Sequence, residues 1–232
     1  MRDTIRHSGN SPDGVAVSRE PDERAQSSGE EIANAISHGV ALLAALIGTP
    51  WLILEAIRVG DGAFVAGVSV FCATMVFLYL ASTVYHALPA GRARSFFWVL
   101  DHAGIFLLIA GTYTPFTLGV LGGTRGWALF GAVWGLAGAG VLLKSLGAQL
   151  PGWVSTGLYL AMGWLVLVAM DLVLTRVPTA GLAWLVAGGV AYTLGVAFFA
   201  TDHRVRYHHF IWHLFVMSGT ACHYFAIYGY AA

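Results

Sequence analysis

Seven long apolar runs follow one another along this chain, and they constrain its fold more than any other feature. Each run holds close to the ~20 apolar residues that an α-helix needs to cross a bilayer. Glycine, proline or charged residues separate the runs. The sequence therefore predicts an all-α integral membrane protein, a seven-transmembrane helix bundle with spans at about 32–56, 63–88, 97–121, 126–143, 153–175, 180–200 and 207–230.

Charged residues are too scarce to cover a water-soluble surface. They make up 10% of the 232 residues, whereas 57% are hydrophobic, and an ordinary soluble domain is about 25% charged. This composition excludes a soluble globular enzyme, a nucleic-acid-binding protein and a disulfide scaffold. The partners that we expect are therefore membrane lipids and no nucleic acid.

The first 29 residues differ from the rest of the chain. They are polar and rich in Ser, Pro, Gly, Asp and Arg, so they cannot bury enough apolar surface to fold alone. We expect residues 1–29 to form a disordered cytoplasmic tail and residues 30–232 to form the seven-transmembrane domain.

Lysine and arginine are distributed unequally between the two ends of the predicted spans. Loops on the cytoplasmic side of a membrane protein carry an excess of these residues. An inside N-terminus and an outside C-terminus leave only Arg58, Arg125 and Arg176 outside. The inner segments then hold Arg2, Arg6, Arg19, Arg24, Arg92, Arg94, Lys144, Arg204 and Arg206.

Polar side chains gather at one depth of the predicted bundle. In the first span Glu31, Asn34 and His38 fall within an arc of about 60° on one helical face. With the N-terminus inside, the inner ends of three further spans carry Ser82 and His86, then Asp101, then His209 and His213. Ionisable groups are costly in lipid, so their presence indicates a partner or a function.

These residue types suit a metal ion. His209 and His213 are four residues apart, so they lie on one face of a helix. His86 from another helix completes three nitrogen ligands, and three histidines plus water form the open arrangement of a catalytic zinc site. A carboxylate such as Asp101 is suited to bind or orient that water, and the Ser82 hydroxyl to hydrogen-bond the water or a substrate carbonyl.

Each of these residues taken alone has a structural explanation. A His pair four apart arises by chance, a single membrane histidine commonly packs and hydrogen-bonds, and an Asp at a helix start complements the helix dipole. Glu31, Asn34 and His38 fit a hydrogen-bond network between helices. Only the combination at one depth favours a metal.

The remaining polar residues are predicted to lie outside this site. We expect His102 and His208 to point elsewhere on their helices and His203 to be exposed in a loop. His223 is about 15 Å along its helix from His213, too far to share one ion. Asp171 is expected to pair with the nearby Arg176.

In combination these motifs resemble the haemolysin III family, the bacterial branch of the progestin and adipoQ receptors. The resemblance covers nearly all of residues 30–230. It implies seven helices with the N-terminus inside, in the inner (plasma) membrane of a bacterium. It also implies zinc on His86, His209 and His213, with Asp101 contacting zinc through water and Ser82 as the family's serine. The motifs are Glu31 to His38, Ser82-Thr-Val-Tyr-His86, Leu100-Asp101-His102, and His209-Phe-Ile-Trp-His213 followed by His223.

Three functions stay open at this point. The first is a zinc-dependent membrane hydrolase that cuts an amide or ester in a lipid, similar to the ceramidases related to this family. In the second, a receptor or regulator of membrane homeostasis uses zinc as a structural ion. The third is a pore or transporter, including the cytolytic activity that gave the family its name.

Overall fold

The computed structural model describes residues 24–146 and 152–230, and all regular secondary structure in these two ranges is helical. The elements are α1 (Ser28–Val59), α2 (Gly62–Ala87), α3 (Arg92–Pro115), the π-helical η1 (Phe116–Leu121), α4 (Gly123–Ser145), α5 (Gly152–Gly163), the 3-10 helical η2 (Trp164–Ala169), α6 (Met170–Arg176), α7 (Thr179–Phe199) and α8 (His208–Tyr230).

Seven spans in the described part of the chain are long and apolar enough to cross a membrane. Helix α3 continues through η1 as one span, and α5, η2 and α6 together form another. The mean hydropathy of the spans lies between 1.3 and 2.2. The seven-span helical fold predicted from the sequence is thereby confirmed.

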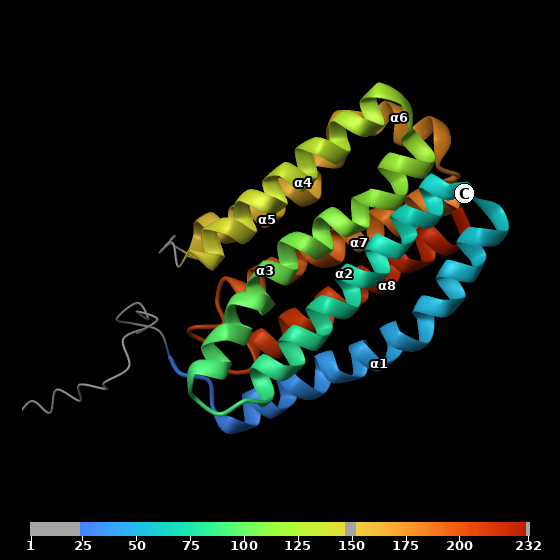
Figure 1. Ribbon diagram of the computed structural model, residues 1–232. Helices are drawn as coiled ribbons and strands as arrows, with labels where there is room; N and C mark the ends of the chain where they lie inside the picture. Colours follow the sequence, from blue (N-terminus) through green and yellow to red (C-terminus); the bar gives the residue numbers. More distant parts are fainter. Residues whose placement is uncertain (1–23, 147–151, 231–232) are drawn as a thin grey trace, which may run out of the picture.

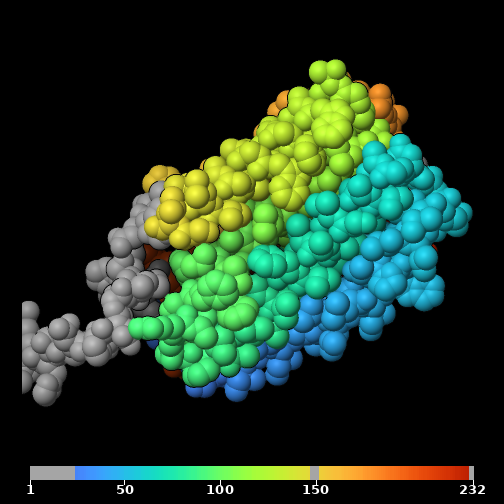
Figure 2. Space-filling view, in the orientation of Figure 1, coloured from blue at the N-terminus to red at the C-terminus, as the bar shows by residue number. Residues whose placement is uncertain are grey.

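The helices pack side by side as one bundle, in which each helix contacts neighbours on two sides (Figure 1). Helix α2 packs between α1 and α3, and α4 follows α3 on its other side. Helix α8 packs against both α7 and α1. In the space-filling view α1, α2 and α3 run side by side along the length of the molecule (Figure 2).

Helix α1 places large apolar side chains on its outside and small or polar ones on its inside. Its exposed face includes Ile36, Leu43 and Ile47, whereas Asn34 and His38 are buried. This is the reverse of a soluble amphipathic helix. It is the arrangement expected where lipid solvates the apolar face and neighbouring helices satisfy the polar groups.

The start of α1 is set by a capping box. Ser27 and Glu30 hydrogen-bond each other's backbone N–H groups, which satisfies donors that the first turn leaves free. The helix therefore begins at Ser28, four residues before the start of the predicted first span. The predicted N-terminal tail lies outside the described residues as far as residue 23.

A proline changes the helical geometry at the end of α3. Pro115 has no N–H to donate, and the chain continues from it as the π-helical η1. Gly122 and Gly123 then have φ values of 51° and 56°, which favour glycine. This turn lets α4 run back alongside α3.

One end of the bundle gathers the segments that carry the polar residues. Helix α2 ends there, and α1, α3 and α8 begin there (Figure 1). The alternation of spans along the chain produces this arrangement, as the sequence predicted. The candidate site lies at this end.

Candidate metal centre

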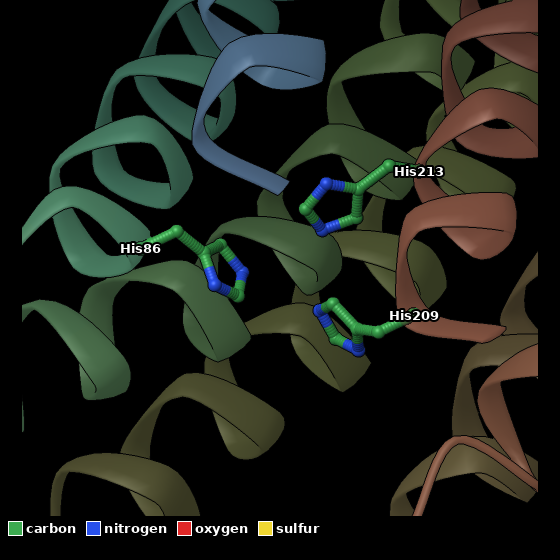
Figure 3. Close-up of side chains that lie close together, drawn as sticks. All are labelled: His86, His209 and His213. Carbon is green, nitrogen blue, oxygen red and sulfur yellow. The ribbon is translucent and has the colours of Figure 1, made fainter. Parts of the chain in front are cut away.

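Three histidines from two helices converge at this end of the bundle. His86 comes from the last turn of α2, and His209 and His213 come from the first turns of α8. One ring nitrogen from each residue lies within 4.8 Å of the others, close enough to hold a metal ion (Figure 3). His86 and His213 are buried, and His209 is half-buried. The proximity of the three predicted ligands is thereby established.

Each of these histidines contacts an oxygen atom through Nδ1. His86 Nδ1 lies 2.7 Å from Glu31 Oε2, and His209 Nδ1 lies 2.7 Å from Asp202 Oδ2. His213 Nδ1 lies 3.0 Å from Ser37 Oγ. The Nε2 atom of His86 is buried and has no hydrogen-bond partner among the described residues, so it remains available to an ion.

Asp101 lies in the third turn of α3, on the wall of a cavity that it shares with two of the histidines. It is 6% exposed and lines this cavity of about 20 Å³ together with His209 and His213. A space of this size holds about one water molecule. The remaining cavity wall consists of His38, Leu78, His102, Ile105, Phe199, Trp212 and Val216.

Ser82 lies one helical turn before His86 and is completely buried. Its Oγ makes no hydrogen bond within the described residues. Four other serines in the helices instead donate to a backbone carbonyl, as Ser69 does to Val65. The Ser82 hydroxyl is therefore available as a donor next to a predicted ligand.

The structure brings two further histidines to the cavity. The ring of His38 stacks on that of His213, so the polar face of α1 reaches the predicted ligands. His102 also lines the cavity, and its Nδ1 lies 2.9 Å from Trp98 O. The expectation that His102 points away from the site was wrong, because the cavity extends along α3 past Asp101.

The predictions for His208 and His223 agree with the structure, whereas His203, predicted to be exposed in a loop, lies in a turn but is half-buried. His208 contacts Thr201 Oγ1 at 2.8 Å, away from the cavity. His223 lies against Tyr192, with its ring next to Gly188. Neither residue is among those that line the cavity.

The predicted pair of Asp171 and Arg176 was wrong. Asp171 instead forms a two-bond ion pair with Arg125, with both N–O distances at 2.7 Å. Arg176 donates to the carbonyl groups of Val120 and Leu121. The reason is helical geometry, since residues five apart on α6 point in directions about 140° apart, so each side chain contacts a different neighbour.

The contacts of Glu31 and Asp202 with the ligand histidines were not predicted from the sequence. The sequence places Glu31 only on a polar helix face, and Asp202 precedes His209 by seven residues, a spacing that does not indicate a contact. For Glu31, the sequence contained one indication of this contact, since its carboxylate is predicted to lie at the same depth in the bundle as the histidines.

Two carboxylates near the site form ion pairs with arginines in the described part of the chain. Glu30 pairs with Arg24 and Glu31 with Arg94. Asp202 contacts His209, and Asp101 faces the cavity. The charges of Asp101 and Asp202 would help to offset those of a divalent cation, because a charge in a low-dielectric site needs a partner.

The chain is similar to known proteins over most of its length. The family model described as haemolysin-III related matches residues 26–224. The hemolysin-3 homolog of Bacillus subtilis (strain 168) is 37% identical over 198 residues, which cover 85% of this chain and 92% of that protein. Hemolysin-3 of Bacillus cereus is 38% identical over 198 residues, covering 85% and 90%.

A human protein is also similar to this chain. Monocyte to macrophage differentiation factor is 31% identical over 217 residues, which cover 87% of this chain and 84% of the human protein. No solved structure matches.

Proposed function

This chain belongs to the haemolysin III family, within the progestin and adipoQ receptor superfamily, and on that premise we propose that it is a zinc-dependent membrane hydrolase. Its substrate would be an amide or ester of a membrane lipid. The observation that carries the proposal is the convergence of three histidines beside Asp101 and a water-sized cavity.

The residues present fit zinc. Three imidazoles are the protein ligands of one common class of catalytic zinc site, which keeps a fourth position for water. The buried, unpartnered Nε2 of His86 is the kind of atom that a metal satisfies. Asp101 and Asp202 supply two negative charges near the three rings.

A zinc ion bound by His86, His209 and His213 would supply Lewis acidity and a water whose pKa is near 7. Beside such an ion, Asp101 would accept a proton from the water whose oxygen attacks the carbonyl carbon of the substrate. The Ser82 hydroxyl donates a hydrogen bond to the carbonyl oxygen. Asp101 then returns the proton to the leaving nitrogen or oxygen, so the products are a carboxylic acid and an amine or alcohol.

The setting of the site favours a substrate that is dissolved in the bilayer. Besides the polar side chains, the cavity wall includes apolar ones, among them Ile105, Phe199 and Val216. The helices that carry the site are long enough to cross a membrane. An acyl chain would be solvated by such surroundings, whereas a charged water-soluble substrate would have to lose its hydration.

The orientation and compartment belong to the same proposal. The N-terminus lies inside and the C-terminus outside, in the plasma membrane of a bacterium. At the end of the bundle where the site lies, the described chain carries five arginines, the excess expected on the cytoplasmic side. They are Arg24, Arg92, Arg94, Arg204 and Arg206.

A second candidate function has one observation in its favour. The cavity of about 20 Å³ holds one water but not a lipid carbonyl with its neighbouring atoms. A receptor or regulator with a structural zinc needs no larger space. Under this alternative the ion fixes α2 against α8, and no bond is broken.

The test is turnover by purified protein loaded with zinc. An N-acylated sphingoid base and a diacylglycerol serve as the amide and the ester, and release of free fatty acid is measured. We expect release by the wild type and a loss of release in His209→Ala. Asp171→Asn is the matched control, because Asp171 is an exposed carboxylate far from the cavity.

Two outcomes decide between the candidates. If zinc-loaded wild type releases fatty acid from neither lipid, while zinc raises its melting temperature, the hydrolase is refuted and the structural role replaces it. If Asp171→Asn loses activity as completely as His209→Ala, the effect is not specific to the site.

A further inference from the structure

The protons on the three converging histidines can be located from their hydrogen bonds. Glu31 and Asp202 contact His86 and His209 through carboxylate oxygens, which only accept when ionised. Each contact therefore places the proton of a neutral ring on Nδ1. The lone pair that is left lies on Nε2.

His213 follows the same pattern through a hydroxyl group. Ser37 Oγ donates its own proton to Asn34 O at 2.8 Å. The same oxygen lies 3.0 Å from His213 Nδ1, so it accepts from that nitrogen. His213 thus also carries its proton on Nδ1 and presents Nε2.

This shared tautomer matters for metal binding. A neutral imidazole has one N–H and one lone pair, and the hydrogen bond made by one nitrogen decides which nitrogen is free for a metal. Three rings without partners would each have to adopt the correct tautomer and orientation when the ion binds. Partners that hold Nδ1–H in advance remove that cost and make the ligand more basic.

Glu31 is itself held in place. Its other carboxylate oxygen accepts a hydrogen bond from Arg94 of α3, and Arg94 also donates to Leu88 O at 2.6 Å. The Arg94 guanidinium thus ties the end of α2 to Glu31 of α1. This contact orients the carboxylate toward His86.

The segment that carries Asp202 is held by the first turn of α1 and by Arg24, which precedes that helix. Arg24 donates to the carbonyl oxygens of Asp202 and Val205, each at 3.4 Å. Glu30 accepts from the backbone N–H of Tyr207 at 2.9 Å. Tyr207 has φ 62°, an uncommon conformation for a non-glycine residue, directly before α8. These contacts anchor the loop next to the first ligand of α8.

We infer that Glu31, Ser37 and Asp202 are positioning residues that preset all three histidines to offer Nε2 to the metal. Helix α1 contributes no ligand of its own, yet it bears two of the three partners. This inference rests on the metal site of the proposed function and does not require hydrolysis.

The experiment measures zinc affinity by competition with a chelating dye, in purified full-length protein. Glu31→Gln and Asp202→Asn keep the size of the side chain and an accepting oxygen but lose the charge. Glu31→Leu and Asp202→Leu lose the acceptor. We expect about 10- to 100-fold weaker binding in the leucine variants and a smaller loss in the amide variants.

Cobalt(II) provides a readout that a purely structural role would not change. Its visible absorption depends on the number and arrangement of its ligands. We expect an altered spectrum in Glu31→Leu and a spectrum close to wild type in Glu31→Gln, because glutamine still accepts from Nδ1. Glu55→Gln is the matched control, since Glu55 is another arginine-paired carboxylate of α1 but lies away from the site.

The outcomes separate this inference from the proposed function. If wild type binds zinc and both leucine variants bind it equally well with the wild-type cobalt spectrum, the positioning roles are refuted and the metal site stands. If wild type binds neither metal, the metal site itself is refuted, and the positioning roles with it.

A further variant tests the role of Glu31 if the substitutions of Glu31 itself prevent folding. Arg94→Gln leaves the contact between Glu31 and His86 in place and removes the guanidinium that orients Glu31, together with its hydrogen bond to Leu88 O and its contact with the Tyr85 ring. We expect it to weaken zinc binding in the same direction and by less. Wild-type affinity in Arg94→Gln would refute the role of Arg94 in orienting Glu31.

Discussion

The imidazole rings of His38 and His213 lie stacked, with centroids 3.5 Å apart and planes 8° apart. His38 belongs to α1 and His213 to α8, so the contact joins segments 175 residues apart in sequence. The two ring nitrogens of His38 are buried without hydrogen-bond partners among the described residues. His38 therefore contacts the predicted ligand set through a ring face.

Replacement of His38 separates a packing role from a ligand role. His38→Phe keeps a ring against His213 and removes both nitrogens, so we expect zinc content to stay near one ion per chain. His38→Ala removes the stacked ring, which contributes about 0.5–1.5 kcal/mol beyond its buried area, and should lower the melting temperature. Elemental analysis and thermal unfolding provide the two readings. A zinc-free His38→Phe protein would make His38 a ligand.

Substitutions of Asp101 and of His86 should differ in their effects on bound zinc and on activity. Asp101→Asn keeps three imidazoles, so most zinc should remain bound, whereas any hydrolysis should fall by about 10²- to 10⁴-fold because the proton acceptor is gone. His86→Ala should lose both zinc and activity. Metal content and turnover are measured side by side, with zinc near saturation. A zinc-free Asp101→Asn protein would mean that Asp101 binds the ion directly.

A close approach of two helices gives a stability prediction. A Cβ added to Gly67 of α2 would lie 2.8 Å from Cα of Pro115 and 2.9 Å from its nitrogen. Backbone atoms cannot rotate away, so Gly67→Ala should lower the free energy of unfolding by about 1–3 kcal/mol. Gly138→Ala in α4 is the control, because an added Cβ there has no neighbour within 4 Å. Denaturation in detergent compares the two, and equal stability would contradict the tight contact.

The topology can be tested at the end of the chain. A reporter that is active only outside the cytoplasm, fused after Ala232, should be active in intact cells. The reason is the excess of Lys and Arg at the end of the bundle where α1 begins. A reporter that is active only in the cytoplasm should stay silent at the same position. The reverse result would place the candidate site on the outer side.

Much of the architecture could be predicted from the sequence. Runs of about 20 apolar residues predict spans because the bilayer leaves a helix few alternatives. Alternation of the spans then brings the end of α2 and the starts of α3 and α8 to one end. For this reason His86, Asp101, His209 and His213 could be grouped by their depth alone, and the folded chain brings them together.

The hydrogen-bond partners of these histidines could not be predicted in the same way. The pairing of Glu31 with His86, and of Asp171 with Arg125 in place of Arg176, depends on the rotation of each helix and the distance between neighbours. Depth in the membrane follows from position along a span. Which side chains face each other across a helix contact does not follow from that position, because many rotations of a helix about its axis fit the same apolar pattern.

The sequence by itself thus determined that the chain spans a membrane, how many times it does so, and at what depth the polar groups lie. These follow from hydrophobicity and from the fixed rise of a helix. Only the tertiary structure decided that α1 supplies the partners of His86 and His213 and that His38 stacks on His213. Such contacts depend on angles and distances between helices, which are set by the packing of all their side chains together.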